Sequence, residues 1–281
     1  DMHTGGEPLR VILEGYPELK GDNVLAYRRY ARDNFDHLRT ALMFEPRGHA
    51  DMYGCIIVPP NSPEADFGIL FLHNEGYSTM CGHAIIAITK LAVEMRWLAV
   101  TEGDNLLKID APCGRINAFA RVAEGQLAGI RFQCVPSFVL ALDQTIELNG
   151  YGTIKFDLAY GGAFYAYVEA NQFELELSPD NYPKLIELGM QVKHAVLQKD
   201  MNILHPYEED LSFLYGTIFI DQTETKGIDS RNVCIFAEGE VDRSPTGSGV
   251  AGRMAIHHAR NELKVGESML IESITGSVFK G

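Results

Sequence analysis

The chain has few basic residues. Its 281 residues contain 24 lysines and arginines against 38 aspartates and glutamates, which gives a formal net charge of -14. A protein that binds nucleic-acid phosphates needs a basic face, and an anionic membrane attracts the same kind of surface. The deficit therefore argues against a nucleic-acid partner and against membrane attachment. A small anionic substrate is not excluded, because a helix N-terminus holds an anion without basic side chains.

Long apolar runs and paired cysteines are also lacking. The longest apolar stretch, residues 84–99, is interrupted by Lys90, Glu94 and Arg96, so it is unsuited to span a bilayer. The five cysteines are odd in number, widely spaced and never in a C-x-x-C pattern. Such usage fits a reducing compartment better than a disulfide framework, so we expect a cytoplasmic protein.

What the chain does contain is typical of a globular protein, with 46% hydrophobic and 22% charged residues. Its length allows one large domain or two of ordinary size. Two stretches of the chain follow the same plan. In each, a Gly-Gly turn and a strand are followed by a buried apolar helix, and the turn and strand lie at residues 4–11 in the first stretch and 160–168 in the second. The similar offsets predict two pseudo-symmetric halves, residues 1–150 and 151–281, with the boundary near residues 149–152.

Two short motifs stand at the predicted starts of these helices: residues 80–84 (MCGHA) and residues 242–249 (DRSPTGSG). Each places a small polar residue directly before a glycine, Cys81 in the first motif and Thr246 in the second. A helix N-terminus presents unpaired N–H groups and partial positive charge, and glycine lets a ligand approach the backbone. If the two halves face each other, both helix starts converge on one anion, such as the carboxylate of an amino acid.

Cys81 is the candidate general base. A helix N-terminus lowers a thiol pKa from about 8.5 to roughly 3.5–7.5, so a thiolate can take a proton from carbon near neutral pH. The alternative interpretation is a buried, inert cysteine, which we favour for the other four. We do not expect His83 to serve Cys81 as a base, because residues i and i+2 on a helix do not face each other. The spacing of Cys81, His83 and Cys113 resembles no common zinc site either.

Other candidates keep two interpretations each. Asp242 precedes the tight turn of residues 243–247 and either caps that turn or pairs with the ammonium group of a substrate. Phe164 and Tyr165, after the second Gly-Gly turn, either pack on a substrate ring or belong to the core. The sequence leaves these alternatives open.

Motifs in three parts of the chain, in the same order, resemble the proline racemase family: residues 1–8 (DMHTGGEP), 80–83 and 242–249, with residues 45–54 (EPRGHADMYG) also similar. The resemblance covers nearly the whole chain. Family members continue past the position of Gly281, so we expect further residues there. The resemblance implies an α/β (α+β) fold of two halves similar to diaminopimelate epimerase, each a curved, mostly antiparallel sheet around a central helix. It also implies a site between the halves, a homodimer, and no pyridoxal cofactor or metal.

In the family's racemases a cysteine at each helix start removes or returns the α-proton of the substrate. By position, Cys81 matches the first cysteine, and Asp242 matches the residue near the substrate nitrogen. The resemblance further implies substrate contacts at Gly82, His83, Gly247 and Ser248. The chain departs from the racemases at Thr246, because a hydroxyl is a poor acid or base near pH 7.

A branch of the family with cysteine first and threonine second dehydrates trans-3-hydroxy-L-proline, and this chain resembles that branch. The implied reaction uses one base. The Cys81 thiolate removes the α-proton, the 3-hydroxyl leaves as water with help from Thr246, and the enamine becomes Δ1-pyrroline-2-carboxylate. Two alternatives remain: a proline or hydroxyproline racemase or epimerase with Thr246 or water as second acid, and a non-catalytic module that binds amino acids.

Overall fold

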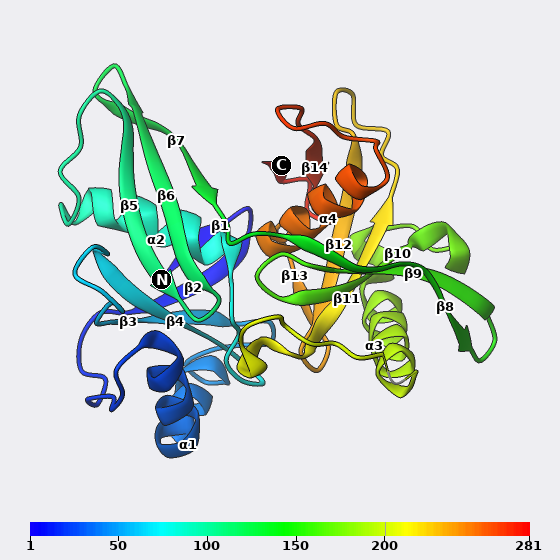
Figure 1. Ribbon diagram of the computed structural model, residues 1–281, viewed down its shortest axis with the longest axis horizontal. Helices are drawn as coiled ribbons and strands as arrows, with labels where there is room; N and C mark the ends of the chain where they lie inside the picture. The colour runs from blue at the N-terminus through cyan, green and yellow to red at the C-terminus, as the bar shows by residue number, and fades with distance from the viewer. Residues whose placement is uncertain (200) are drawn as a thin grey trace. The chain divides into compact units, whose positions relative to one another are not determined.

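The computed structural model describes residues 1–199 and 201–281. The chain divides into two compact units, Asp1–Val135 and Pro136–Gly281 (Figure 1).

The division precedes the boundary expected at residues 149–152. Those residues form the turn between β8 (Phe138–Leu148) and β9 (Gly152–Tyr160), which pair antiparallel with Leu148 opposite Gly152. A hairpin keeps both strands in one sheet, so β8 belongs to the second unit. The glycines that resemble a linker serve this tight turn, where Gly150 and Gly152 both have positive φ.

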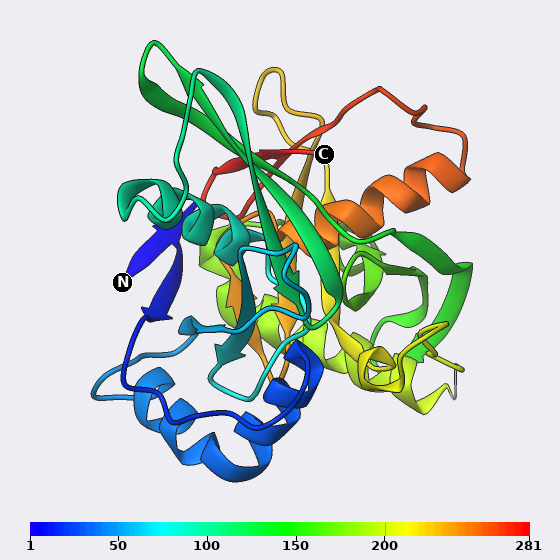
Figure 2. The ribbon, with the colours of Figure 1, turned by 60° about the vertical axis from the view of Figure 1, so that its left-hand side comes forward.

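The first unit is a seven-stranded sheet in the order β1-β2-β3-β4-β5-β6-β7 with two helices. Its elements are β1 (Met2–Thr4), β2 (Glu7–Ile12), α1 (Val24–Met43), β3 (Tyr53–Val58), β4 (Phe67–His73), α2 (Gly82–Glu94), β5 (Gly103–Ala111), β6 (Gly114–Ala123) and β7 (Gln126–Gln133). Only β2–β3 and β4–β5 pair in parallel. Helix α2 contacts β1, β2, β6 and β7, and α1 contacts β3, β4 and β5. Figures 1 and 2 show the two helices on opposite sides of β3 and β4.

The second unit is an eight-stranded sheet in the order β15-β14-β12-β11-β10-β9-β8, with β13 paired to β12. Its other elements are β10 (Phe164–Glu169), η1 (Ala170–Phe173), η2 (Pro179–Asn181), α3 (Tyr182–Gln198), η3 (Glu209–Leu211), β11 (Leu214–Asp221), β12 (Ser230–Phe236), β13 (Glu240–Asp242), α4 (Gly247–Ala259), β14 (Leu270–Glu272) and β15 (Val278–Lys280). Only β10–β11 and β12–β14 pair in parallel. Helix α4 contacts β8, β9 and β10. The expected fold class, two mostly antiparallel halves with a buried helix each, is confirmed.

The two motif helices are short and deeply placed. Both α2 and α4 have 13 residues, and each begins at the glycine that the motifs predicted. The apolar residues of α2 surround the helix on most sides, which is typical of a helix buried within a domain. In the part of the chain that the structure describes, no helix combines the length and the apolarity needed to cross a bilayer.

Helix α4 approaches the strand segment before β10 through glycine. A Cβ atom at Gly161 would overlap the Ser248 carbonyl oxygen and would lie 2.6 Å from the Gly252 nitrogen. Both are backbone atoms, so they cannot move aside without shifting the helix. The absence of a side chain at Gly161 therefore sets how closely the first turns of α4 pack.

We expect Gly161→Ala to lower the free energy of unfolding by about 1–3 kcal/mol, the usual cost of overpacking. Urea unfolding measures this change in the free energy of unfolding. Gly129→Ala in β7 is the matched control, because a Cβ atom there meets nothing within 4 Å. Equal stability of Gly161→Ala and the unsubstituted protein would show that α4 is not held against this glycine.

Candidate active site

Cys81 lies at the N-cap of α2 in an extended conformation, with φ -146° and ψ 104°. Its side chain makes no capping hydrogen bond and is 4% exposed. The thiol therefore does not satisfy the N–H groups of the first turn of α2. These N–H groups and the helix dipole give this end of α2 its positive potential.

The Cys81 thiol lies beside the imidazole of His83, with the sulfur 3.2 Å from Nδ1 and 3.7 Å from Nε2. Nε2 lies 3.2 Å from the carbonyl oxygen of Pro8. A carbonyl only accepts, so we assign the ring proton to Nε2, which leaves Nδ1 unprotonated beside the sulfur. Nδ1 can thus accept the thiol proton.

This contact corrects the expectation that Cys81 and His83 do not face each other. The spacing rule applies to two residues that are both helical. Cys81 is extended, so its side chain turns back toward the residue two positions later. The sequence already indicated this extended conformation, because the residue before a predicted helix start is normally non-helical.

Three strands fix the position of His83, which is 3% exposed. Pro8 of β2 accepts from its ring, and the Thr4 hydroxyl of β1 donates to its carbonyl oxygen at 2.9 Å. Tyr53 of β3 meets the imidazole edge-on, with ring centroids 4.9 Å apart. The hydroxyl of Tyr53 in turn hydrogen-bonds to Ser78. The imidazole is therefore held in one orientation against the thiol.

Thiols elsewhere in the chain lie in different surroundings. Burial raises the pKa of Cys55 far above its usual range and the pKa of Cys134 to about 12. Burial, and secondarily the nearby Cys134, raise the pKa of Cys113. These three thiols stay protonated, as expected for structural cysteines.

The second motif forms a tight turn between β13 and α4. One carboxylate oxygen of Asp242 accepts from the Ser244 N–H at 2.7 Å, and the Ser244 hydroxyl accepts from the Thr246 N–H at 3.2 Å. Asp242 thus caps the turn, one of the two interpretations left open by the sequence. The Asn232 amide donates to the carbonyl oxygen of Pro245 at 3.4 Å.

Thr246 is strained, and its hydroxyl has no hydrogen-bond partner among the described residues. Its φ of 63° and ψ of 92° are unusual for a β-branched residue, and such conformations cost about 1–3 kcal/mol. The side chain is buried at 5% exposure, and Oγ1 makes no hydrogen bond to any residue that the structure describes. A buried hydroxyl left unpaired is also costly. Strain and an orphan hydroxyl at one residue indicate a position shaped for a ligand group.

Side chains of β10 form hydrogen bonds with the residues that follow Thr246. The hydroxyls of Tyr165 and Ser248 lie 2.7 Å apart, and Tyr167 donates to the Gly249 carbonyl oxygen at 2.9 Å. From the sequence, Tyr165 was expected to pack on a substrate ring or in the core, and Tyr167 was not among the candidate residues. The two tyrosines are two positions apart on one strand, so the sequence indicated that both side chains lie on the same face of that strand. Phe164 is fully buried against the rings of Phe138 and Tyr160.

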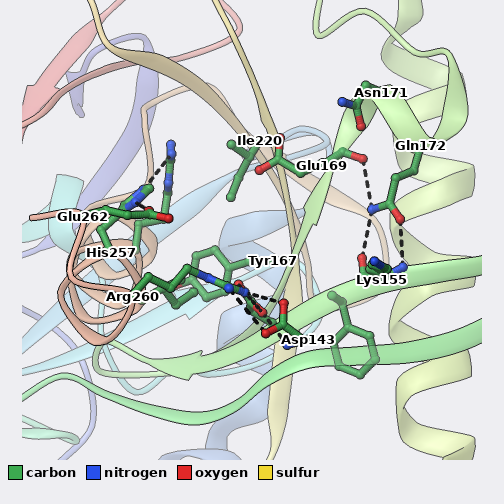
Figure 3. A pocket seen from close by; sticks show the side chains of 14 residues that line it. Asp143, Lys155, Tyr167, Glu169, Asn171, Gln172, Ile220, His257, Arg260 and Glu262 are labelled. Atoms are coloured by element: carbon green, nitrogen blue, oxygen red, sulfur yellow. Dashed lines mark hydrogen bonds and ion pairs between the residues drawn. The ribbon is translucent and has the colours of Figure 1, made fainter.

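A cavity of about 370 Å³ lies along the C-terminal half of α4 (Figure 3). Arg260 is paired there with Asp143 and Asp157, and His257 with Glu262. None of the predicted site residues lines this cavity. Among the residues described, no group of His, Cys, Asp and Glu is arranged to hold a metal ion.

Buried Arg253 connects the wall of this cavity to the turn before Thr246. It donates to Ser230 and Asn232 at 2.9 Å each, and Asn232 contacts Pro245. Burial lowers the pKa of Arg253 to about 10, so the guanidinium stays charged near neutral pH. Its role is to hold the turn.

The structure thus brings the predicted residues together as two groups. Cys81, Gly82 and His83 lie at the start of α2, and the other group, Asp242, Thr246, Gly247 and Ser248, lies at the start of α4. The first group offers a thiol with an adjacent proton acceptor. The second offers a helix N-terminus and a buried hydroxyl. Their convergence on one substrate stays a prediction.

A family model described as proline racemase matches residues 1–281. A trans-3-hydroxy-L-proline dehydratase of Colwellia psychrerythraea is 53% identical over 279 residues, covering 99% of this chain and 78% of the relative. The Homo sapiens protein of the same name is 45% identical over 287 residues, covering 100% of this chain and 81% of the relative.

Solved structures agree with this similarity. A hydroxyproline epimerase from Agrobacterium vitis with bound trans-4-hydroxy-L-proline has a TM-score of 0.92 at 31% identity, covering 99% of this chain and 81% of that chain. A phenazine biosynthesis protein of the PhzF family from Bacillus anthracis has a TM-score of 0.56 at 12% identity, covering 100% and 85%, a likeness of fold alone.

Proposed function

This chain belongs to the proline racemase family, and on that premise we propose that it dehydrates trans-3-hydroxy-L-proline to Δ1-pyrroline-2-carboxylate. Relatives at 45–53% identity bear the name of that activity. The observation that carries the proposal is the asymmetry of the two helix starts. A thiol with a proton acceptor stands at α2, and a buried hydroxyl that has no partner among the described residues stands at α4.

The first step is removal of the α-proton by Cys81. The thiol gives its proton to His83 Nδ1, which lies 3.2 Å away, and the imidazolium then holds the thiolate by charge. The thiolate takes the α-proton, so an S–H bond forms as the C–H bond breaks. The electron pair moves toward the substrate carboxylate, where helix N–H groups stabilise the developing charge. Gly82, Gly247 and Ser248 supply these backbone groups, and Asp242 pairs with the substrate ammonium.

The second step is loss of the 3-hydroxyl. The electron pair at the α-carbon forms a double bond to the neighbouring carbon as the C–O bond breaks. Thr246 donates a hydrogen bond to the departing oxygen, which is the role its orphan hydroxyl fits. The α-proton taken by Cys81 and the departing hydroxide together make one water. The enamine then tautomerises to the cyclic imine.

An epimerase is the second candidate, because the hydroxyproline epimerase structure has the same fold at 31% identity. An epimerase must return a proton to the opposite face of the α-carbon. Thr246 is a poor donor for that purpose, since a hydroxyl does not exchange protons readily with a carbanion near neutral pH.

A substrate panel tests the proposal. Trans-3-hydroxy-L-proline, trans-4-hydroxy-L-proline and L-proline are incubated with the protein and followed by proton NMR and chiral chromatography. We expect the cyclic imine from the first compound and no change in the other two. Epimerisation of trans-4-hydroxy-L-proline or L-proline without imine formation would replace the proposal with the second candidate.

Loss of the His83 imidazole should shift the pH dependence of activity. In His83→Gln the thiol must ionise without a neighbouring acceptor, so thiolate forms only at higher pH. We expect kcat near neutral pH to fall about 10²-fold or more, the usual contribution of a positioned proton acceptor, with partial recovery as pH rises. A pH–kcat profile measures it. An unchanged profile would show that His83 does not receive the Cys81 proton.

The homodimer and the cytoplasmic location stay predictions. Sedimentation equilibrium tests the first, and cell fractionation tests the second.

A further inference from the structure

Two tyrosines on β10 hold consecutive residues of the first turn of α4. Tyr165 and Tyr167 are two positions apart, so their side chains share one face of the strand. They are 1% and 3% exposed. The Tyr165 hydroxyl meets the Ser248 side chain, and the Tyr167 hydroxyl meets the Gly249 backbone carbonyl. A Cβ atom at Gly252 would overlap the Tyr167 hydroxyl, so the glycine permits this approach.

The two contacts differ in what they do for a ligand. Tyr167 can only donate to a carbonyl, and carbonyls of a helix point toward its C-terminus, away from an anion at the start of α4. Ser248 is different, because its hydroxyl both accepts and donates. When Tyr165 donates to Ser248, the proton of Ser248 is available for an acceptor at the N-terminus of α4.

Both tyrosines remain protonated in this setting. Burial is the main cause that raises the pKa of each hydroxyl well above its ordinary value. Tyr165 therefore keeps the proton that it can donate to Ser248, and it is the donor of their hydrogen bond whenever Ser248 donates elsewhere. A hydroxyl that accepts one hydrogen bond also donates more strongly.

We infer that Tyr165 is a positioning residue that directs the Ser248 hydroxyl onto the substrate carboxylate at the N-terminus of α4. The inference rests on the proposed function for the identity of the substrate. Tyr165 does not touch the substrate, so its effect passes entirely through Ser248. Tyr167 anchors the same turn without taking part in ligand binding.

The test compares Tyr165→Phe with Tyr167→Phe, since each removes one buried hydroxyl from the same strand face. Binding of trans-3-hydroxy-L-proline is measured calorimetrically in the Cys81→Ser background, where the ligand is not consumed, and L-proline binding in the unsubstituted background. We expect Tyr165→Phe to weaken both about three- to ten-fold, the value of one hydrogen bond, and Tyr167→Phe to change them less than about two-fold. Both should lower the melting temperature.

A double-mutant cycle with Ser248→Ala shows whether Tyr165 acts through Ser248. We expect Tyr165→Phe to have no further effect on Kd once Ser248 is alanine. Unchanged Kd in Tyr165→Phe, equal weakening in Tyr167→Phe, or additive effects with Ser248→Ala would each overturn the inference. Binding of L-proline without dehydration of any substrate would contradict the proposed function alone. Absence of binding by either compound to the unsubstituted protein would overturn both.

Discussion

Cys81→Ser is expected to lower kcat for dehydration by about 10³–10⁴-fold, the upper range for loss of a positioned general base. A serine hydroxyl has nearly the same shape as the thiol but does not ionise near neutral pH. His83 remains 3.2 Å from the position of the sulfur, yet it cannot convert a serine into an effective carbon base. Substrate binding should persist, because the helix N–H groups of α2 do not depend on the Cys81 side chain.

Cys134→Ser is the matched control, since it makes the same chemical change in the same unit. Burial raises the pKa of Cys134 to about 12, so its thiol is protonated and unsuited to catalysis. We expect this variant to retain kcat within about two-fold, as is usual for substitutions away from the reacting groups. Dehydration by Cys81→Ser at a rate near that of the unsubstituted protein would remove Cys81 from the mechanism.

Thr246→Val is expected to separate proton removal from water loss. Valine keeps the branched shape at φ 63° but lacks the hydroxyl that we propose donates to the departing oxygen. Loss of one such donor commonly costs about 10²–10³-fold, so dehydration should slow by that factor. Exchange of the substrate α-proton with D2O should continue, because Cys81 and His83 are unchanged.

The same substitution should stabilise the protein. The Thr246 hydroxyl is buried without a hydrogen-bond partner among the described residues, and removing such a group relieves about 1 kcal/mol or more. Thr246→Ser, which keeps the hydroxyl, should retain most of the activity. Dehydration by Thr246→Val as fast as by Thr246→Ser would show that the hydroxyl takes no part in water loss.

The sequence predicted where the two motif helices begin better than it predicted how the candidate residues contact one another. Both helix starts lie where the motifs placed them, at Gly82 and Gly247, because a small residue before an apolar helical run is a strong local signal. The Cys81–His83 contact was missed because a helical spacing rule was applied to an extended residue.

Other features depend on contacts between distant parts of the chain. The orphan hydroxyl of Thr246 and the positive φ of that residue follow from how α4 packs, which the residue type does not reveal. The pairing of Tyr165 with Ser248 joins residues far apart in sequence. The division at Val135 was missed because the hairpin turn after β8 has the composition of a linker.

Proton NMR of the unsubstituted protein with trans-3-hydroxy-L-proline in D2O tests the one-base dehydration most directly. The thiol–imidazole pair and the threonine at the second helix start predict that the ring signals give way to those of Δ1-pyrroline-2-carboxylate, with no epimer at the α-carbon. Accumulation of the α-epimer with the 3-hydroxyl retained would contradict it, because only a second proton donor facing Cys81 across the substrate could produce that compound.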